Sequence, residues 1–444
     1  MVRRTAEIFL ADADDWEVIL AKYGINGIWD ETHHQKVQQA LEKVLGYVPS
    51  VVKDLELNNP TARPLFHRRM SNNSIAFREK PSREMLNLIF TIMQAEGEPG
   101  FVNLEAASKR RPNAKGLNPC AEILLDSRGV CNLTTVNVTA FVSNGQLDLE
   151  GLREAQRLSA RAGVRMTLLD LELPGWDAVH KRDRLIGTSL TGWYDAMDAL
   201  GYDGVAETLL LQDLRAVSHD AARQYSQELR VPMPLLSTTV KPEGTLSQVA
   251  GGVSSGLHRS HSPYYFRRIR INANDALVQV AKELGWTMHA EVGTAGFNDE
   301  EMLAKQWVIN QASTVVITFP VASGAKVTKN DVSVQEQFDT YFKFQEHYTD
   351  HNSSNTITVK PGEWETAEQI VWDGWDDFIG VSFLSHDGGT YVLAPYQECT
   401  KEEYDALQAS MGAFDVDLLH KYEQGGLSDD IDDADCATGA CPVR

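Results

Sequence analysis

The stretch that decides the fold is GLNPCAEILLDSRGVCNLTT, residues 116–135, which holds two of the five cysteines in a chain of 444 residues. Cys120 follows a proline and stands two residues before Glu122. Proline fixes its own φ and moves the residue before it out of the helical region. We therefore expect Cys120 to be presented from a stiff loop rather than from a helix.

The neighbours of Cys120 also restrict its chemistry. A carboxylate as close as that of Glu122 disfavours a thiolate, which makes Cys120 a poor ordinary nucleophile. A neutral thiol beside an acid/base group suits hydrogen-atom transfer instead, because S–H then loses an atom and not a proton. The pentapeptide 118–122 leaves a second interpretation open, in which Cys120 is a buried cysteine in a tight turn.

Composition limits the class of protein. With 43% hydrophobic and 23% charged residues, the chain can bury a large core. The formal net charge of -21 argues against nucleic-acid binding, because a phosphate backbone would be repelled. No apolar run reaches the roughly 20 residues that span a bilayer, so we expect no membrane association and a cytoplasmic location. Cysteines this sparse do not suggest a disulfide scaffold; in a reducing cell, paired thiols are more often catalytic or metal-bound.

Hydrophobic periodicity predicts an α/β protein. Apolar residues spaced by three and four predict amphipathic helices at 35–48, 82–94, 152–162 and 213–229. Short β-branched or apolar runs predict strands at 236–240, 314–319 and 356–359. Helices that alternate with buried strands are typical of an α/β architecture. The end of the chain, residues 425–444, is rich in aspartate and glycine, so we expect it to be a mobile tail.

The tail carries a second pair of cysteines. Cys436 and Cys441 enclose Gly439 and can close a small disulfide loop. A flexible chain from residue 425 to Cys436 spans roughly 18 Å and at most about 36 Å, so the pair can reach a neighbouring site. Zinc binding is the weaker alternative, because no third or fourth ligand lies nearby. Two incidental terminal thiols are also compatible with the sequence, and we expect no metal site.

Two later stretches could bind an anion. KPEGTLS, residues 241–247, follows the predicted strand 236–240 and offers backbone N–H groups, hydroxyls and one lysine to a phosphate, although it is not a Walker loop. Residues 258–271 then concentrate four arginines and two histidines. In a strand, Arg268 and Arg270 would share one face. A plain turn and a solvated basic face are the respective alternatives.

In combination, these motifs resemble the catalytic C-terminal portion of a ribonucleotide reductase. NPCAE, residues 118–122, looks like the finger-loop motif of that family, and Cys131 in VCNLTTVN matches the spacing of its redox partner. CATGAC, residues 436–441, matches the C-terminal dithiol, and RLIGTSLTGW, residues 184–193, also resembles a family segment. The likeness extends over most of the chain.

Within the family, KPEGTLS followed by SSGLHRSHSPYYFRRIRI looks most like the monomeric class II type, which depends on adenosylcobalamin and reduces ribonucleoside triphosphates. RRTAEI and HRRMSNNSI near the N-terminus fit the same type. Iron-dependent relatives relay a radical through adjacent tyrosines near the C-terminus, whereas the Tyr-Tyr pair here is Tyr264 and Tyr265 in mid-chain. The resemblance therefore implies adenosylcobalamin as cofactor and a ribonucleotide as substrate.

The resemblance also implies an architecture. Residues 1–424 are expected to form half of a ten-stranded α/β barrel around a central finger loop, with 16–66 as a helical insertion and 425–444 as a flexible redox-active tail. The family places the redox partner of Cys131 upstream, but no cysteine precedes Cys120. We therefore expect an N-terminal reductase chain to supply that cysteine, the other half of the barrel and the effector site.

The catalytic roles follow from the resemblance as well. Cys120 would become the thiyl radical that takes the 3′-hydrogen of the ribose. Glu122 would act as general base at the 3′-hydroxyl and assist loss of the 2′-hydroxyl as water, while Asn118 would hydrogen-bond the substrate. Residues expected to contact the substrate or its phosphates are Asn118, Pro119, Cys120, Ala121, Glu122, Lys241, Pro242, Glu243, Gly244, Thr245, Leu246 and Ser247.

The reducing equivalents would come from other thiols. Cys131 would supply one of the two reducing thiols, and Cys436 with Cys441 would re-reduce the resulting disulfide before a thioredoxin-like protein restores the tail. Cys399 has no assigned partner. Two alternatives remain open: a fragment of an iron-dependent (class I) large subunit, and a catalytically silent regulatory or binding chain.

Overall fold

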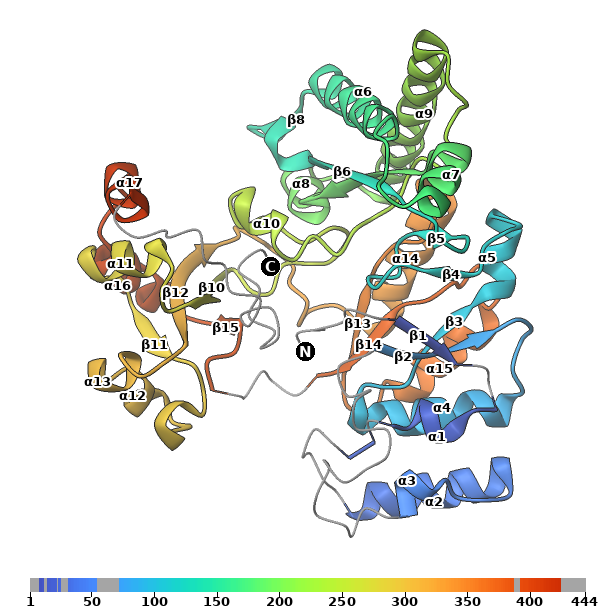
Figure 1. The fold of residues 1–444 in the computed structure, drawn as a ribbon, viewed down its shortest axis with the longest axis horizontal. Helices are drawn as coiled ribbons and strands as arrows, with labels where there is room; N and C mark the ends of the chain where they lie inside the picture. The colour runs from blue at the N-terminus through green and yellow to red at the C-terminus, as the bar shows by residue number, and fades with distance from the viewer. Residues whose placement is uncertain are drawn as a thin grey trace. The chain divides into compact units, whose positions relative to one another are not determined.

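The computed structural model describes residues 8–11, 14–21, 23–24, 31–53, 72–386 and 392–424 (Figure 1). The chain divides into two compact units. Unit 1 comprises residues up to Ser260 together with Asp331–His386, and unit 2 comprises His261–Asn330 together with the residues from Asp387 onward. The predicted tail, with Cys436 and Cys441, lies outside the described residues.

Unit 1 is built on parallel strands. Three of them form a sheet in the order β1-β2-β3, and two further parallel pairs join β6 to β9 and β13 to β14. The bounds of these strands are β1 Ile8–Ala11, β2 Asn72–Phe77, β3 Gly100–Asn103, β6 Asn132–Asn137, β9 Ile186–Thr191, β13 Thr356–Val359 and β14 Ser382–Ser385.

Extended segments connect these parallel pairs. Thr238 bridges Thr188 of β9, and Val240 bridges Ser353, both in the parallel sense. The predicted strand 236–240 is therefore extended, but it forms isolated bridges in place of a regular ladder. Two of its backbone amides, those of Ser237 and Thr238, donate to the Asp350 carboxylate instead of to a neighbouring strand. The described residues show no closed barrel.

Helices cover these strands, and the two largest hydrophobic cores of unit 1 lie between them. One lies around β2, β3, β13 and β14, and the other around β6 and β9. Figure 1 shows α6 and α9 side by side next to β6, and α6 contacts both β6 and β9. The helices are α1 Trp16–Ile19, α2 Glu31–Leu45, α3 Ser50–Lys53, α4 Arg83–Glu96, α6 Leu149–Met166, α8 Trp193–Leu200, α9 Gly204–Leu229, α14 Val334–His347 and α15 Trp364–Asp373.

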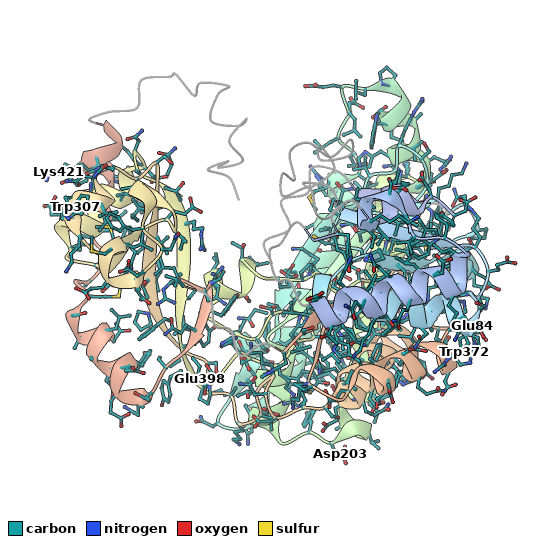
Figure 2. All side chains as sticks on the ribbon, turned by 90° about the horizontal axis from the view of Figure 1, so that it is seen from below. Glu84, Asp203, Trp307, Trp372, Glu398 and Lys421 are labelled. Atoms are coloured by element: carbon teal, nitrogen blue, oxygen red, sulfur yellow. The ribbon has the colours of Figure 1, made fainter. Side chains whose placement is uncertain are left out.

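The four predicted helices are confirmed as α2, α4, α6 and α9, with different ends. The side chain of Ser82 accepts a hydrogen bond from the Met85 amide and begins α4 at the next residue. The side chain of Asp203 accepts a hydrogen bond from the Ala206 amide and caps α9. This helix therefore begins at Gly204, nine residues before the predicted start at residue 213. Asp203 is labelled in Figure 2.

The described part of the segment 16–66 is helical and belongs to the main core of unit 1. Trp16, Val37, Leu41 and Val52 are all buried in the cluster that also holds residues of α4. Because these side chains are among the most buried in the chain, α1 to α3 are part of the hydrophobic core of this unit.

Shorter elements of unit 1 connect the strands and helices. They are α5 Leu104–Arg110, β4 Gly116–Leu117, β5 Leu124–Leu125, η4 Val138–Phe141, β7 Val142–Ser143, β8 Gln146–Leu147, α7 Pro174–Asp183 and α10 Leu246–Val249. Two of them, β4 and β5, pair in the antiparallel sense and carry the NPCAE motif between them. In the part of the chain that the structure describes, no helix has the length and apolar character needed to cross a bilayer.

Unit 2 is an antiparallel sheet of four strands in the order β11-β12-β10-β15. The predicted strand 314–319 is confirmed as part of β12, which pairs with β10 along nine residues. Lys421 (labelled in Figure 2) lies 3.1 Å from the Glu283 carboxylate and ties α17 to α11. The elements are β10 Tyr264–Asn272, α11 Ala276–Glu283, β11 Met288–Ala290, η5 Thr294–Gly296, α12 Glu300–Leu303, α13 Gln306–Ile309, β12 Thr314–Ala322, β15 Tyr396–Glu398, α16 Lys401–Ser410 and α17 Val416–Gln424.

Candidate active site

The NPCAE motif forms the tight end of the β4–β5 hairpin. Asn118 holds the turn through three hydrogen bonds. Its side-chain oxygen accepts a bond from the Ile123 backbone amide at 3.0 Å. Its backbone amide donates to the Ile123 carbonyl at 3.3 Å, and its backbone carbonyl accepts from the Ala121 amide at 2.8 Å. Ala121 has a φ of 64°, a left-handed conformation that is uncommon for alanine. Cys120 therefore stands on a loop and not on a helix.

The hairpin separates the thiol from the carboxyl. Cys120 is a reduced, exposed thiol, so the structure contradicts the interpretation of this residue as a buried cysteine. Glu122 is 2% exposed, although it lies only two residues further along. The left-handed conformation at Ala121, between the two residues, accompanies this change from solvent to interior.

The carboxyl of Glu122 is only partly satisfied by its surroundings. Its Oε2 atom is buried and has no hydrogen-bond partner among the described residues. Burial raises the pKa of Glu122, while a hydrogen bond from Asn118 and the charge of Lys241 act in the opposite direction. A carboxyl in this state retains a proton more readily than an exposed one.

The loop 241–247 is fixed to β6 through Thr135. The Thr135 hydroxyl donates to the Glu243 carboxylate at 2.7 Å, and the Lys241 ammonium donates to the same hydroxyl at 3.1 Å. Lys241 also lies 3.5 Å from Glu243, whose side chain is fully buried. Glu243 thus offsets part of the positive charge that the sequence suggested for a phosphate.

The remaining residues of this loop differ in their accessibility. Gly244, Thr245 and Leu246 are exposed, whereas Ser247 is buried and its hydroxyl lies 3.0 Å from that of Ser255. The first three can therefore reach a ligand, while Ser247 is engaged inside the fold.

Cys131 lies directly before β6 and is a reduced, half-buried thiol. Burial raises its pKa well above the usual value, the charge of Glu122 acts in the same direction, and that of Arg111 opposes them. Cys131 is therefore held as a thiol near neutral pH. The side chains of Leu133 in β6 and of Ile123 in the hairpin both lie against Gly187 of β9, so the start of β6 is close to the carboxyl side of the hairpin.

Arg111 links the hairpin to the end of α7. It donates to the Leu124 carbonyl at 2.6 Å and forms an ion pair with Asp183, in which both side chains are 2% exposed. A buried guanidinium and carboxylate paired in this way fix the base of the hairpin against the helix that precedes β9.

The segment 350–352 also supports the hairpin, although its sequence did not predict this role. The Leu124 amide donates to Nδ1 of His351, and the Asn352 side-chain amide donates to the Ala121 carbonyl at 2.7 Å. Asp350 binds Arg215 and His219 at 2.7 Å each. The one signal in the sequence is the polar run TDHNSSN, residues 349–355, directly before the predicted strand 356–359, and a run of this kind usually indicates a surface loop.

The arginines of the basic stretch are engaged within their own units. Arg259 pairs with Asp198 at 2.9 Å in unit 1, and in unit 2 Arg268 pairs with Glu300 at 3.0 Å. Arg267 donates to the Pro395 carbonyl at 3.1 Å. Arg270 lies 3.5 Å from the Glu291 carboxylate. Each of the four guanidinium groups thus has a partner within its own unit, although the buried Nε atoms of Arg267 and Arg268 have none among the described residues. The described structure therefore gives no support to an open anion site formed by this stretch.

Comparisons with known proteins bear on the fold and the site. Residues 23–218 match the family model described as ribonucleotide reductase, barrel domain. The adenosylcobalamin-dependent ribonucleoside-triphosphate reductase of Lactobacillus acidophilus is 27% identical over 420 residues, which are 85% of this chain and 53% of that protein. The reductase of the same name from Lactobacillus gasseri is 27% identical over 454 residues, 92% of this chain and 57% of that protein.

A solved structure shows the same fold. It is the crystal structure of a B-12 dependent (class II) ribonucleotide reductase, with a TM-score of 0.71 and 24% identity over 95% of this chain and 56% of the other. The chain thus spans about half the length of the relatives it matches. The predicted resemblance is confirmed: this chain is related over most of its length to ribonucleotide reductases, and its residues 23–218 match their barrel domain.

Proposed function

We propose that this chain is the catalytic portion of a ribonucleotide reductase that converts ribonucleoside triphosphates to 2′-deoxyribonucleotides, with Cys120 as the hydrogen-transferring thiol. The observation that carries the proposal is the hairpin, which exposes Cys120 and buries Glu122 with one carboxyl oxygen unpartnered among the described residues. The relatives are named ribonucleoside-triphosphate reductases, which supports the same substrate class.

The proposed steps use three residues of the hairpin. Cys120, as a thiyl radical, takes the 3′-hydrogen atom of the ribose and later returns it. As a carboxylate, Glu122 accepts the 3′-hydroxyl proton and then assists departure of the 2′-hydroxyl as water. Its raised pKa makes the carboxylate a stronger proton acceptor, which supports this role. Asn118 orients the substrate while its side-chain oxygen holds the turn.

The reduction requires two thiols. In the balanced reaction, one ribonucleotide and two thiols give one deoxyribonucleotide, one disulfide and water. We propose Cys131 as one of these thiols, because it precedes β6 and is influenced electrostatically by Glu122. We further propose that a separate N-terminal chain supplies the second thiol and the effector site, and that Cys436, Cys441 and a thioredoxin-like protein restore the pair.

The proposed cofactor is adenosylcobalamin, for which the relatives are named. When bound, it supplies radical chemistry, and the exposed thiol of Cys120 fits a group that faces such a cofactor. Two pockets lie in the described part of the chain away from Cys120. One, of about 720 Å³, is lined mainly by residues of α4 and α15, and the other, of about 260 Å³, by residues of α9 and α14.

For the substrate phosphates, we propose the loop 241–247. Its exposed residues Gly244, Thr245 and Leu246 present backbone groups and one hydroxyl, and the Lys241 ammonium lies at the inner end of the loop. The iron-dependent alternative is not favoured, because the similar reductases are named adenosylcobalamin-dependent.

The test is an assay for deoxynucleotide formation with adenosylcobalamin and dithiothreitol, supplemented with an N-terminal reductase portion. Wild type and Cys399→Ser should form product, whereas Cys120→Ser should form none with any reductant. Cys399 is a suitable control because it lies in unit 2. Activity in the Cys120→Ser variant would refute the proposal, and inactivity of every preparation would favour the catalytically silent alternative.

A further inference from the structure

Asn352 contacts both residues that follow Cys120 in the turn. Its side-chain amide donates to the Ala121 carbonyl at 2.7 Å and to the Gly380 carbonyl at 3.0 Å. Its backbone amide donates to the Glu122 carbonyl at 3.1 Å. Asn352 is fully buried, so these bonds are made where solvent does not compete for the donors.

Two further buried hydroxyls complete this network. The Tyr341 hydroxyl donates to the Asn352 side-chain oxygen at 2.8 Å and thereby fixes which way the amide points. The Thr239 hydroxyl lies 2.8 Å from both the Glu122 and the Asn352 carbonyls, so its proton is shared between them. The Glu122 carbonyl is thus held from two sides by elements far away in the sequence.

We propose that Asn352, oriented by Tyr341 and assisted by Thr239, is a positioning residue that sets where the Cys120 thiol is presented. The turn needs such support, because Ala121 adopts a left-handed conformation that persists only where surrounding contacts impose it. The bonds from Asn352 act on the carbonyls of Ala121 and Glu122. Ala121 lies between the exposed thiol and the buried carboxyl, and Glu122 carries that carboxyl.

The inference rests on the proposed function for its catalytic meaning, since hydrogen-atom transfer requires reacting atoms about 3–3.5 Å apart. A displacement of roughly 1 Å can lower the rate about 100-fold. Loss of positioning should therefore lower kcat much more than it raises KM, because the loop 241–247 proposed for the substrate phosphates keeps its own contacts to Thr135.

The test compares Thr239→Val with Thr239→Ser in the full chain. Valine keeps the shape of threonine and removes the hydroxyl, whereas serine keeps the hydroxyl. We expect amide hydrogen exchange in residues 116–125 to accelerate about tenfold or more in Thr239→Val and to stay near the wild-type rate in Thr239→Ser. Asn352→Asp should accelerate it further, since a carboxylate oxygen would face the two carbonyls.

Thr318→Val is the matched control. Thr318 is a buried threonine on β12 of unit 2, and its hydroxyl has no hydrogen-bond partner among the described residues. This variant should leave exchange in residues 116–125 unchanged. In all variants, exchange in α4 should match wild type, which separates local loosening of the hairpin from global unfolding.

The kinetic readout uses the assay described above. Thr239→Val should lower kcat about 100-fold with KM within about threefold, and Thr239→Ser should recover most of kcat. Unchanged exchange in both Thr239→Val and Asn352→Asp would overturn the inference, as would a loss expressed only in KM. If the wild-type chain forms no product, the proposed function fails, and hydrogen exchange alone still decides whether Asn352 positions the turn.

Discussion

The backbone amide of Leu124 donates a hydrogen bond of 3.2 Å to Nδ1 of His351, while Nε2 of the same ring donates to the Ile186 carbonyl at 3.1 Å. The two bonds require a neutral imidazole with its proton on Nε2, since a doubly protonated ring could not accept from Leu124. Burial agrees with this state, because it lowers the pKa of His351 to about 4. One side chain thus joins the hairpin strand β5 to β9.

This histidine should make the stability of unit 1 fall in mild acid. Between pH 6.5 and about 4 the unfolded chain binds a proton at His351 that the folded chain does not, so the free energy of unfolding declines as the pH falls. The loss should level off below pH 4 at about 3 kcal/mol or less. Urea unfolding of wild type and His351→Gln at pH 7, 5 and 4 measures it.

The variant serves as the control in that experiment, because His351→Gln removes this titration and leaves the other buried histidines in place. The difference in stability between wild type and variant should shrink as the pH falls. A difference that stays constant from pH 7 to pH 4 would show that His351 does not titrate as proposed.

Glu122→Gln should stabilise the fold while it abolishes turnover. Because burial raises the pKa of Glu122, the folded chain holds a proton that the unfolded chain has released, and stability falls as the pH rises above the ordinary carboxyl range. Glutamine has no carboxyl that could ionise, so this pH-dependent loss of folding stability disappears. The melting temperature of the variant at pH 8 should therefore exceed that of wild type. Product formation should drop about 100- to 10,000-fold through loss of the acid/base group. A lower melting temperature at pH 8 would contradict this account.

Part of the site could be predicted from sequence because proline and spacing act locally. The placement of Cys120 on a loop follows from Pro119, which fixes the backbone locally. The helices α2, α4, α6 and α9 were predictable because their apolar residues repeat at helical spacing.

The segment 350–352 could not be predicted in this way. Asp350, His351 and Asn352 are polar, and polar runs ordinarily indicate solvent-exposed loops, yet all three are buried by groups that come from distant parts of the chain. The antiparallel pairing of β12 with β10 was equally hidden, because 41 residues separate the two strands and hydrophobic pattern alone does not give strand direction.

The cysteines should differ strongly in their reaction with iodoacetamide at pH 8. Cys120 is exposed, whereas burial raises the pKa of Cys131 well above its usual value and that of Cys399 to about 11. Since the thiolate is the reactive form, peptides containing Cys120 should be modified at least about tenfold faster than those containing the other two. Mass spectrometry of timed samples measures the three rates, and equal rates at Cys120 and Cys131 would contradict the raised pKa of the half-buried Cys131 thiol.

The ion pair between Arg111 and Asp183 should matter far more for stability than an exposed pair. Asp183→Asn leaves a buried guanidinium without its main charge partner, so the free energy of unfolding should fall by about 3–5 kcal/mol. Asp213→Asn breaks the more exposed pair with Arg153 and should cost less than about 1 kcal/mol. Equal losses in the two variants, measured by urea unfolding, would show that Arg111 finds another partner.

The register of β10 and β12 has a consequence for how this chain can vary. Tyr264, just after the chain enters unit 2, lies opposite Ala322, just before the chain leaves it at Asn330. The chain thus enters unit 2 at one strand and leaves it after the neighbouring strand. The entropy cost of closing the segment 261–330 therefore depends little on the number of residues between β10 and β12. Insertions or deletions in the connections between the elements of residues 273–313 should therefore be tolerated by the parallel strands of unit 1.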